Sequence, residues 1–200
     1  AALLYDFYDT ILSYLGADSS LQLVVKPKKP LPDALVDAPL LRERLYDFHS
    51  RGRVVILDDL RSPLEAGFAA DVTLALGVSS AGFLTAALGI PTLFVDPALS
   101  IDGPYGGLLQ NVGWERQQSV FDSTAGAMEA IQLQRSEPTN KMLGLLGARA
   151  SALDPFQDGD SASRVGFFVR TFIHMIDQGG TRREAVDVAG KAYTDAYGQE

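Results

Sequence analysis

The chain has 200 residues, of which 46% are hydrophobic and 21% charged, so it is long and apolar enough to form one well-buried globular domain and is not a disordered segment. Its net charge of −8 comes without a basic stripe, and we therefore expect no nucleic-acid partner. The chain has no cysteine and two distant histidines, His49 and His174, which argues against disulfides, thiolate chemistry and a metal site.

The first half of the chain alternates helix-like and strand-like segments. Apolar residues recur every three or four positions from Leu3 to Leu15, which predicts an amphipathic helix that ends at Gly16. The segments that follow are a strand LQLVV (21–25), a helix APLLRERLYDFHSRG (38–52), a strand RVVIL (53–57) and a short helix SPLEAGFAA (62–70).

The same alternation continues to about residue 135. The predicted segments are a strand DVTLAL (71–76), a helix SSAGFLTAAL (79–88), a strand PTLFVD (91–96), a Gly/Pro loop through DGPYGG (102–107), a short strand SVFD (119–122) and a helix STAGAMEAIQLQ (123–134). Continuously apolar strands that alternate with helices indicate a parallel sheet covered on both faces. We therefore predict an α/β fold over residues 1–135, a doubly wound, Rossmann-like parallel sheet.

The remaining residues, 136–200, differ because two helical patterns follow one another with no strand between them. These patterns are SASRVGFFVRTFIHMIDQG (161–179) and TRREAVDVAGKAYTDAYG (181–198). We expect them to be C-terminal helices that pack on the same domain.

Targeting signals are not evident in the sequence. No apolar run reaches the ~18 residues that cross a bilayer, and no signal peptide is recognisable. A cytoplasmic location is expected. Because the chain begins Ala-Ala-Leu-Leu without methionine inside a helical pattern, we also expect it to be a piece of a longer protein.

Candidate ligand-binding residues follow the predicted strands, because ligands of open parallel sheets bind at the carboxyl ends of the strands. Gly77 lets the backbone approach a ligand closely, and Ser79 and Ser80 begin a helix whose free N–H groups favour an anion. Asp96 could accept a hydrogen bond from a sugar or ribose hydroxyl. The alternatives are that one serine only caps the helix and that Asp96 only starts a loop.

Charged residues follow the first two predicted strands. Lys26 and, less strongly, Lys28 could neutralise a phosphate at the same edge of the sheet, although a lysine-rich surface loop is equally ordinary. Asp58 and Asp59 are weaker candidates for binding a cation or a hydroxyl, since aspartate is common in turns.

Together, LVVKPKKP, RVVILDD, AADVTLALGVSSAGFLTAALGIPTLFVDP and VFDSTAGAMEAI resemble the carboxy-terminal, nucleotide-sugar-binding half of GT-B-type glycosyltransferases. The bacterial capsule and surface-polysaccharide transferases are the most similar group, and teichoic-acid glycerophosphotransferases are related to it. Lys26-Pro27, Ser79-Ser80 and Gly89-Ile90-Pro91 match the family pattern, and the resemblance covers about residues 20–135.

The resemblance implies a donor-binding domain that uses a nucleotide-activated sugar as co-substrate and needs no other cofactor. It further implies a glycan or lipid-linked acceptor, a missing N-terminal domain that carries the acceptor site and the usual catalytic base, and the inner face of the membrane as an alternative location. The catalytic residues are therefore not assigned, and the isolated chain is expected to be inactive.

Two departures from the family pattern affect the donor pocket. Lys28 stands where the family has histidine, and Leu84-Thr85 replace the glutamate that contacts ribose in many members. Two other functions stay open: glycerophosphotransfer from a CDP-linked donor, and a non-catalytic nucleotide-binding or interaction domain. A phosphoacceptor receiver module is disfavoured because its acidic pair follows the first strand, whereas here lysines do.

Overall fold

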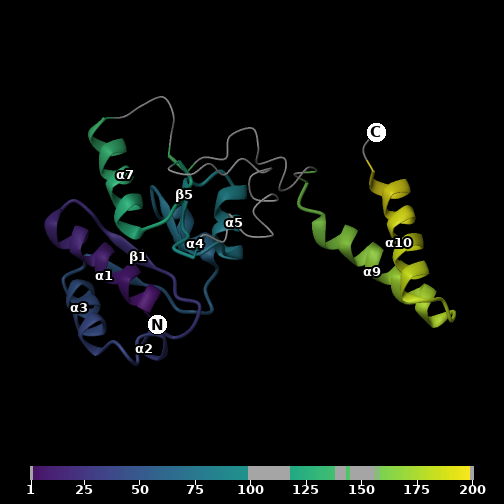
Figure 1. Cartoon of the computed structure of the whole chain (residues 1–200), viewed down its shortest axis with the longest axis horizontal. Coiled ribbons are helices and arrows are strands. Elements are labelled where there is room, and N and C mark those ends of the chain that lie inside the picture. Colours follow the sequence, from purple (N-terminus) through teal and green to yellow (C-terminus); the bar gives the residue numbers. More distant parts are fainter. Residues whose placement is uncertain (1, 99–117, 138–142, 145–155, 157, 199–200) are drawn as a thin grey trace. The chain divides into compact units, whose positions relative to one another are not determined.

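The computed structural model describes residues 2–98, 118–137, 143–144, 156 and 158–198, and the predicted loop through DGPYGG lies outside them. The chain divides into two compact units, Ala1–Asp154 and Pro155–Glu200 (Figure 1). The expected packing of the C-terminal helices on the first domain stays a prediction. No helix among the described residues is long and apolar enough to cross a membrane.

The first unit alternates helices with short strands. In chain order its elements are α1 (Ala2–Ala17), β1 (Leu23–Val25), α2 (Leu31–Ala34), α3 (Pro39–Ser50), β2 (Val54–Ile56), α4 (Pro63–Phe68), β3 (Thr73–Leu76), α5 (Ser80–Ala87), β4 (Thr92–Val95), β5 (Val120–Phe121) and α7 (Thr124–Ser136). Each predicted helix and strand is present, and the four-residue α2 is the addition. The α/β fold is confirmed.

The strands pair in parallel, but in two sheets. β1 pairs with β2, and β3, β4 and β5 form a second sheet in that order. The sequence pattern predicted a single sheet covered on both faces. β4 is covered on both faces as expected, because every one of its residues is buried. β2 is not, because Val55 is 51% exposed.

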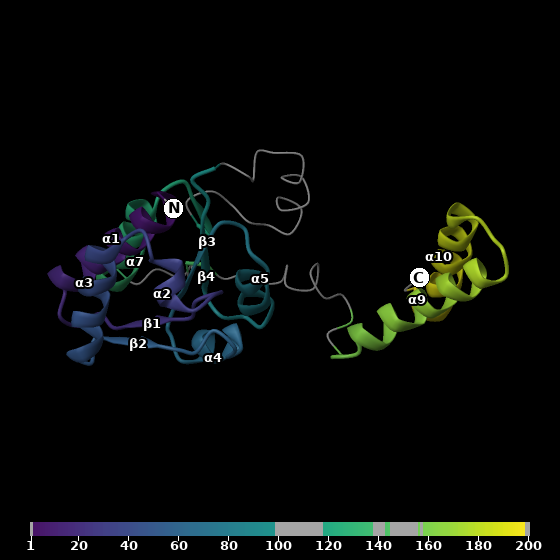
Figure 2. The ribbon, with the colours of Figure 1, turned by 90° about the horizontal axis from the view of Figure 1, so that it is seen from below.

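Helices lie on both sides of the strands. Figures 1 and 2 show α1, α3 and α7 on one side and α4 and α5 on the other. The first side holds the larger apolar cluster, which both sheets share through Val25, Val54, Leu93 and Val95. Phe94 and its neighbours on β3 and β5 face α5 instead, so side chains alternate between the two faces as strand geometry requires.

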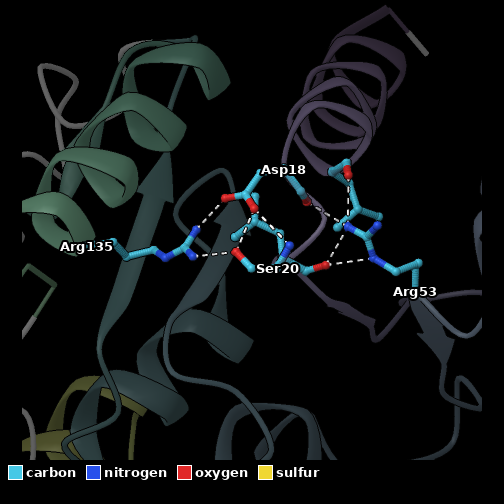
Figure 3. A network of polar contacts seen from close by, with 6 residues as sticks. Asp18, Ser20, Arg53 and Arg135 are labelled. Carbon is cyan, nitrogen blue, oxygen red and sulfur yellow. Dashed lines mark hydrogen bonds and ion pairs between the residues drawn. The ribbon is translucent and has the colours of Figure 1, made fainter.

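An arginine ties the end of α1 to the strands. Arg53 Nη2 donates hydrogen bonds to the carbonyl oxygens of Leu15, Asp18 and Leu21 at 2.9, 2.8 and 2.7 Å. These carbonyls lie at and just beyond the helix end, where the helix supplies no partner of its own. Figure 3 shows this network next to the contact of Asp18 with Arg135.

The second unit contains α9 (Ser161–Asp177) and α10 (Arg182–Tyr197), joined by Gln178–Thr181. The two helices contact each other through aromatic rings, since Phe167 meets Tyr197 and Phe168 meets Tyr193 with ring centroids 5.4 and 6.5 Å apart. Thr181 starts α10 with a capping box shared with Glu184.

Candidate functional site

The candidate site is built on the carboxyl ends of β3 and β4. Gly77, directly after β3, has a φ of +68°, a conformation that glycine adopts without strain. Its amide donates to the carbonyl of Val95 at 2.7 Å and continues the β3–β4 ladder by one bond. This turn leads the chain from β3 into α5.

Two serines occupy the start of α5 in different ways. Ser79 is the N-cap, and its hydroxyl accepts a hydrogen bond from the amide of Gly82 at 3.3 Å. Ser80 is the first helical residue, and its side chain is exposed. The first turn of α5 contains no acidic residue, so the positive end of its dipole is not neutralised there. Ser79 therefore caps the helix, and Ser80 is exposed to solvent.

Asp96 follows β4 and is buried, with only 2% of its surface exposed. Its amide donates to the carbonyl of Phe121 at 2.7 Å, which extends the β4–β5 ladder past the last strand residue. Because Leu76 pairs with Val95, the next residues along, Gly77 and Asp96, lie beside each other at this edge. The structure thus places Gly77 beside Asp96, and Ser79 and Ser80 follow Gly77 at the start of α5.

Lys26 is tied to the loops that follow β1 and β2. Its half-buried ammonium group donates to the carbonyls of Pro27 at 2.7 Å and Asp59 at 3.0 Å. An ammonium group has three donors, so these two bonds leave one for a ligand. Lys26 and Asp59 are therefore brought together, through the Asp59 main chain and not its carboxylate.

Lys28 and Asp58 have ordinary surface roles in this structure. Lys28 is exposed in the loop that precedes α2. The carboxylate of Asp58 accepts from the amide of Leu60 at 2.8 Å, and its carbonyl accepts from the amide of Arg61 at 3.1 Å. These bonds form the turn before α4, as the alternative interpretation of Asp58 predicted.

Two residues that the sequence did not single out as site residues, Gly82 and Thr85, pack α5 against the strands beneath the site. Gly82 lies so close to β3 and β4 that a Cβ atom there would collide with the ring of Phe94 and lie 3.0 Å from the Cβ of Ala75. Thr85 is buried, and its hydroxyl donates to the carbonyl of Gly82 at 3.0 Å and pairs with the hydroxyl of Thr92, also at 3.0 Å. The second glycine in GVSSAG was the available signal for close helix–strand packing.

Among the described residues, no group of three or more histidine or acidic side chains is arranged to hold a metal ion. The site offers main-chain amides, hydroxyl groups and, at the β1–β2 edge, the ammonium group of Lys26. This chemistry suits a phosphate, since amides, hydroxyls and an ammonium group all donate hydrogen bonds. Comparisons with protein-family models, with curated proteins and with solved structures give no significant match to this chain.

Proposed function

We propose that the first unit is the donor-binding domain of a glycosyltransferase that uses a nucleotide-activated sugar, in the synthesis of a bacterial surface or capsular polysaccharide. The observation that carries the proposal is the turn from Gly77 to Ser80. It combines a positive-φ glycine, an exposed hydroxyl and the start of a helix without acidic residues at the carboxyl end of a parallel strand. Amides and hydroxyls arranged in this way bind phosphate.

The arrangement of the helices supports a doubly wound fold. In this fold the two observed sheets would be the two halves of one continuous parallel sheet. α4 and α5 contact each other where Gly67 approaches Thr85, while α1, α3 and α7 share the apolar cluster on the other side. A strand order β2-β1-β3-β4-β5 accounts for this division, since the helices change sides between β1 and β3. Ligands of such sheets bind in the crevice at that change.

With this strand order, Lys26 and Ser80 would both contact the phosphate of the same ligand. Lys26 follows β1 and the Gly77–Ser80 turn follows β3, so the two segments flank the proposed crevice. The amides and hydroxyls at the start of α5, helped by the remaining ammonium donor of Lys26, would stabilise charge that develops on the leaving phosphate.

Titration calorimetry of the chain with UDP-, GDP- and CMP-sugars and with CDP-glycerol tests this proposal. We expect one of the sugar nucleotides to bind; binding of CDP-glycerol alone favours glycerophosphotransfer instead. The variant Ser80→Ala should weaken binding about 10- to 100-fold, because a hydrogen bond to a charged group contributes about 1.5–3 kcal/mol. Its folding stability should not change, because the hydroxyl is exposed.

A matched control separates binding from helix capping. Ser123 caps α7 as Ser79 caps α5, with its hydroxyl accepting from the amide of Gly126 at 3.2 Å. Both Ser79→Ala and Ser123→Ala should cost about 1 kcal/mol of stability. Only Ser79→Ala should also weaken nucleotide binding. Equal effects of the two variants on affinity, or no binding of any donor, would contradict the proposal.

A further inference from the structure

The helical hairpin formed by α9 and α10 buries few large side chains. Among the described residues of the two helices, only Arg164, Ala185 and Ala189 are fully buried, and the aromatic residues between the helices are partly buried. Pairs of helices gain most of their stability from burying an apolar face. The contact between α9 and α10 therefore leaves part of the apolar surface of α9 uncovered within this unit.

An apolar stripe on α9 is the surface that remains to be covered. It consists of Val165, Val169, Ile173 and Ile176, which are between 39 and 61% exposed. Their spacings of four, four and three residues place them on one face of the helix. We call these four residues the α9 stripe.

Two opposite charges accompany the α9 stripe. Arg170 and Asp177 are both exposed, and neither takes part in an ion pair among the described residues. They are seven residues apart, which is two helical turns, so they lie on the same flank. Arg170 comes three residues before Ile173 and Asp177 comes four residues after it, so the charges are nearly symmetric about Ile173.

We propose that the α9 stripe is the interface of a homodimer, in which α9 packs antiparallel against α9 of a second copy about a two-fold axis at Ile173. In this register Ile173 meets its own equivalent, and the adjacent residues Val169 and Arg170, one turn before the axis, lie opposite Ile176 and Asp177 of the other copy, one turn after it. Each contact occurs twice, as an isologous interface requires. A uniformly acidic or basic partner would match only one of the two charges, whereas a second copy matches both.

Sedimentation equilibrium of the full chain tests the proposed dimer. The wild-type protein should dimerise, and Ile173→Glu should raise the dimer dissociation constant at least about a hundredfold, because it brings two like charges together at the axis. Val188→Glu places the same charge at a residue of α10 that is 41% exposed, and it should leave the dissociation constant unchanged. A monomeric wild-type protein, or equal effects of the two variants, would overturn the proposal.

A charge exchange tests the antiparallel register independently of how well the stripe packs. Arg170→Asp alone and Asp177→Arg alone each place like charges opposite one another twice per dimer, and each should weaken dimerisation roughly tenfold. The double variant Arg170→Asp/Asp177→Arg restores both pairs and should restore the dissociation constant. If the double variant is no tighter than either single variant, the proposed register is wrong.

Discussion

The ammonium group of Lys26 joins two loops, and this limits what it can offer a ligand. Its bonds to the carbonyls of Pro27 and Asp59 connect the segment after β1 to the turn before α4. Sequence reasoning identified Lys26 as a cation near a possible phosphate, but the distant carbonyl of Asp59 could not be foreseen from the local pattern. Lys26 therefore shapes the edge of the sheet whether or not it also touches a phosphate.

Asp18 should make the stability of the first unit depend on pH. Hydrogen bonds from the hydroxyl and amide of Ser20, together with the guanidinium of Arg135, lower the pKa of Asp18 from 3.8 to about 2 (Figure 3). A carboxyl group whose pKa is lowered by folding stabilises the folded state above its unfolded pKa, and this contribution is lost as the pH falls through its folded pKa.

The variant Asp18→Asn tests this contribution. The difference in unfolding free energy between wild type and variant should be constant above about pH 5 and should shrink as the pH falls towards 2. Urea denaturation over this range measures it, with Asp187→Asn on α10 as the control for loss of one exposed negative charge. A difference that stays constant down to pH 2 would contradict the assignment.

Gly82 is predicted to be intolerant of any side chain. Gly82→Ala would push a methyl group into the ring of Phe94, which is fully buried, and against Ala75, so we expect a loss of roughly 1–3 kcal/mol in unfolding free energy. Gly190→Ala on α10 has no atom within 4 Å of the added Cβ and should be neutral or stabilising by up to about 1 kcal/mol. Thermal unfolding of both variants measures the contrast.

At the scale of the element, two neighbouring residues of α5, Leu84 and Thr85, differ sharply in how much of each side chain is exposed. Leu84 is 49% exposed, whereas Thr85 is 1% exposed and hydrogen-bonded within the core. Leu84→Glu should fold normally, and Thr85→Glu should unfold the domain because it would bury a carboxylate beside Thr92. Circular dichroism and thermal unfolding distinguish the two; a stable Thr85→Glu variant would show that this side of α5 opens to solvent.

The helices and strands were predictable because their signals are local. Apolar periodicity, the serine caps at Ser79 and Ser123, and Pro63 at the start of α4 each lie within one short segment. The division of the strands into two sheets was not predictable, because pairing depends on tertiary contacts that no single run of residues encodes. The contact between Thr85 and Thr92 is of the same kind, since it joins a helix to the next strand.

At the scale of the whole molecule, the two compact units should respond separately to a mutation in one of them. Arg164 in the second unit is buried, donates twice to Asp158 at 2.6 and 2.9 Å and lies 3.9 Å over the ring of Phe156. This pairing also lowers the pKa of Asp158. Losing it removes the hydrogen bonds of a buried guanidinium group and its packing on the Phe156 ring.

The variant Arg164→Met should therefore lower the stability of the α9–α10 hairpin by roughly 1–3 kcal/mol. Hydrogen exchange measured by mass spectrometry should show faster exchange in α9 and α10 and unchanged exchange in β3 and β4. Arg182→Met, at an exposed residue of α10, is the control. Faster exchange in the strands as well would show that the two units unfold together.

We propose that the Gly77–Ser80 turn and Lys26 together bind the phosphates of a nucleotide. Amide chemical-shift mapping of the labelled full chain during titration with UDP, GDP and CMP tests it most directly. We expect one nucleotide to cause its largest shifts between Gly77 and Gly82, with a second group of shifts around Lys26 and none in α10. Shifts confined to other parts of the chain, or no shifts with any of the three nucleotides, would contradict it.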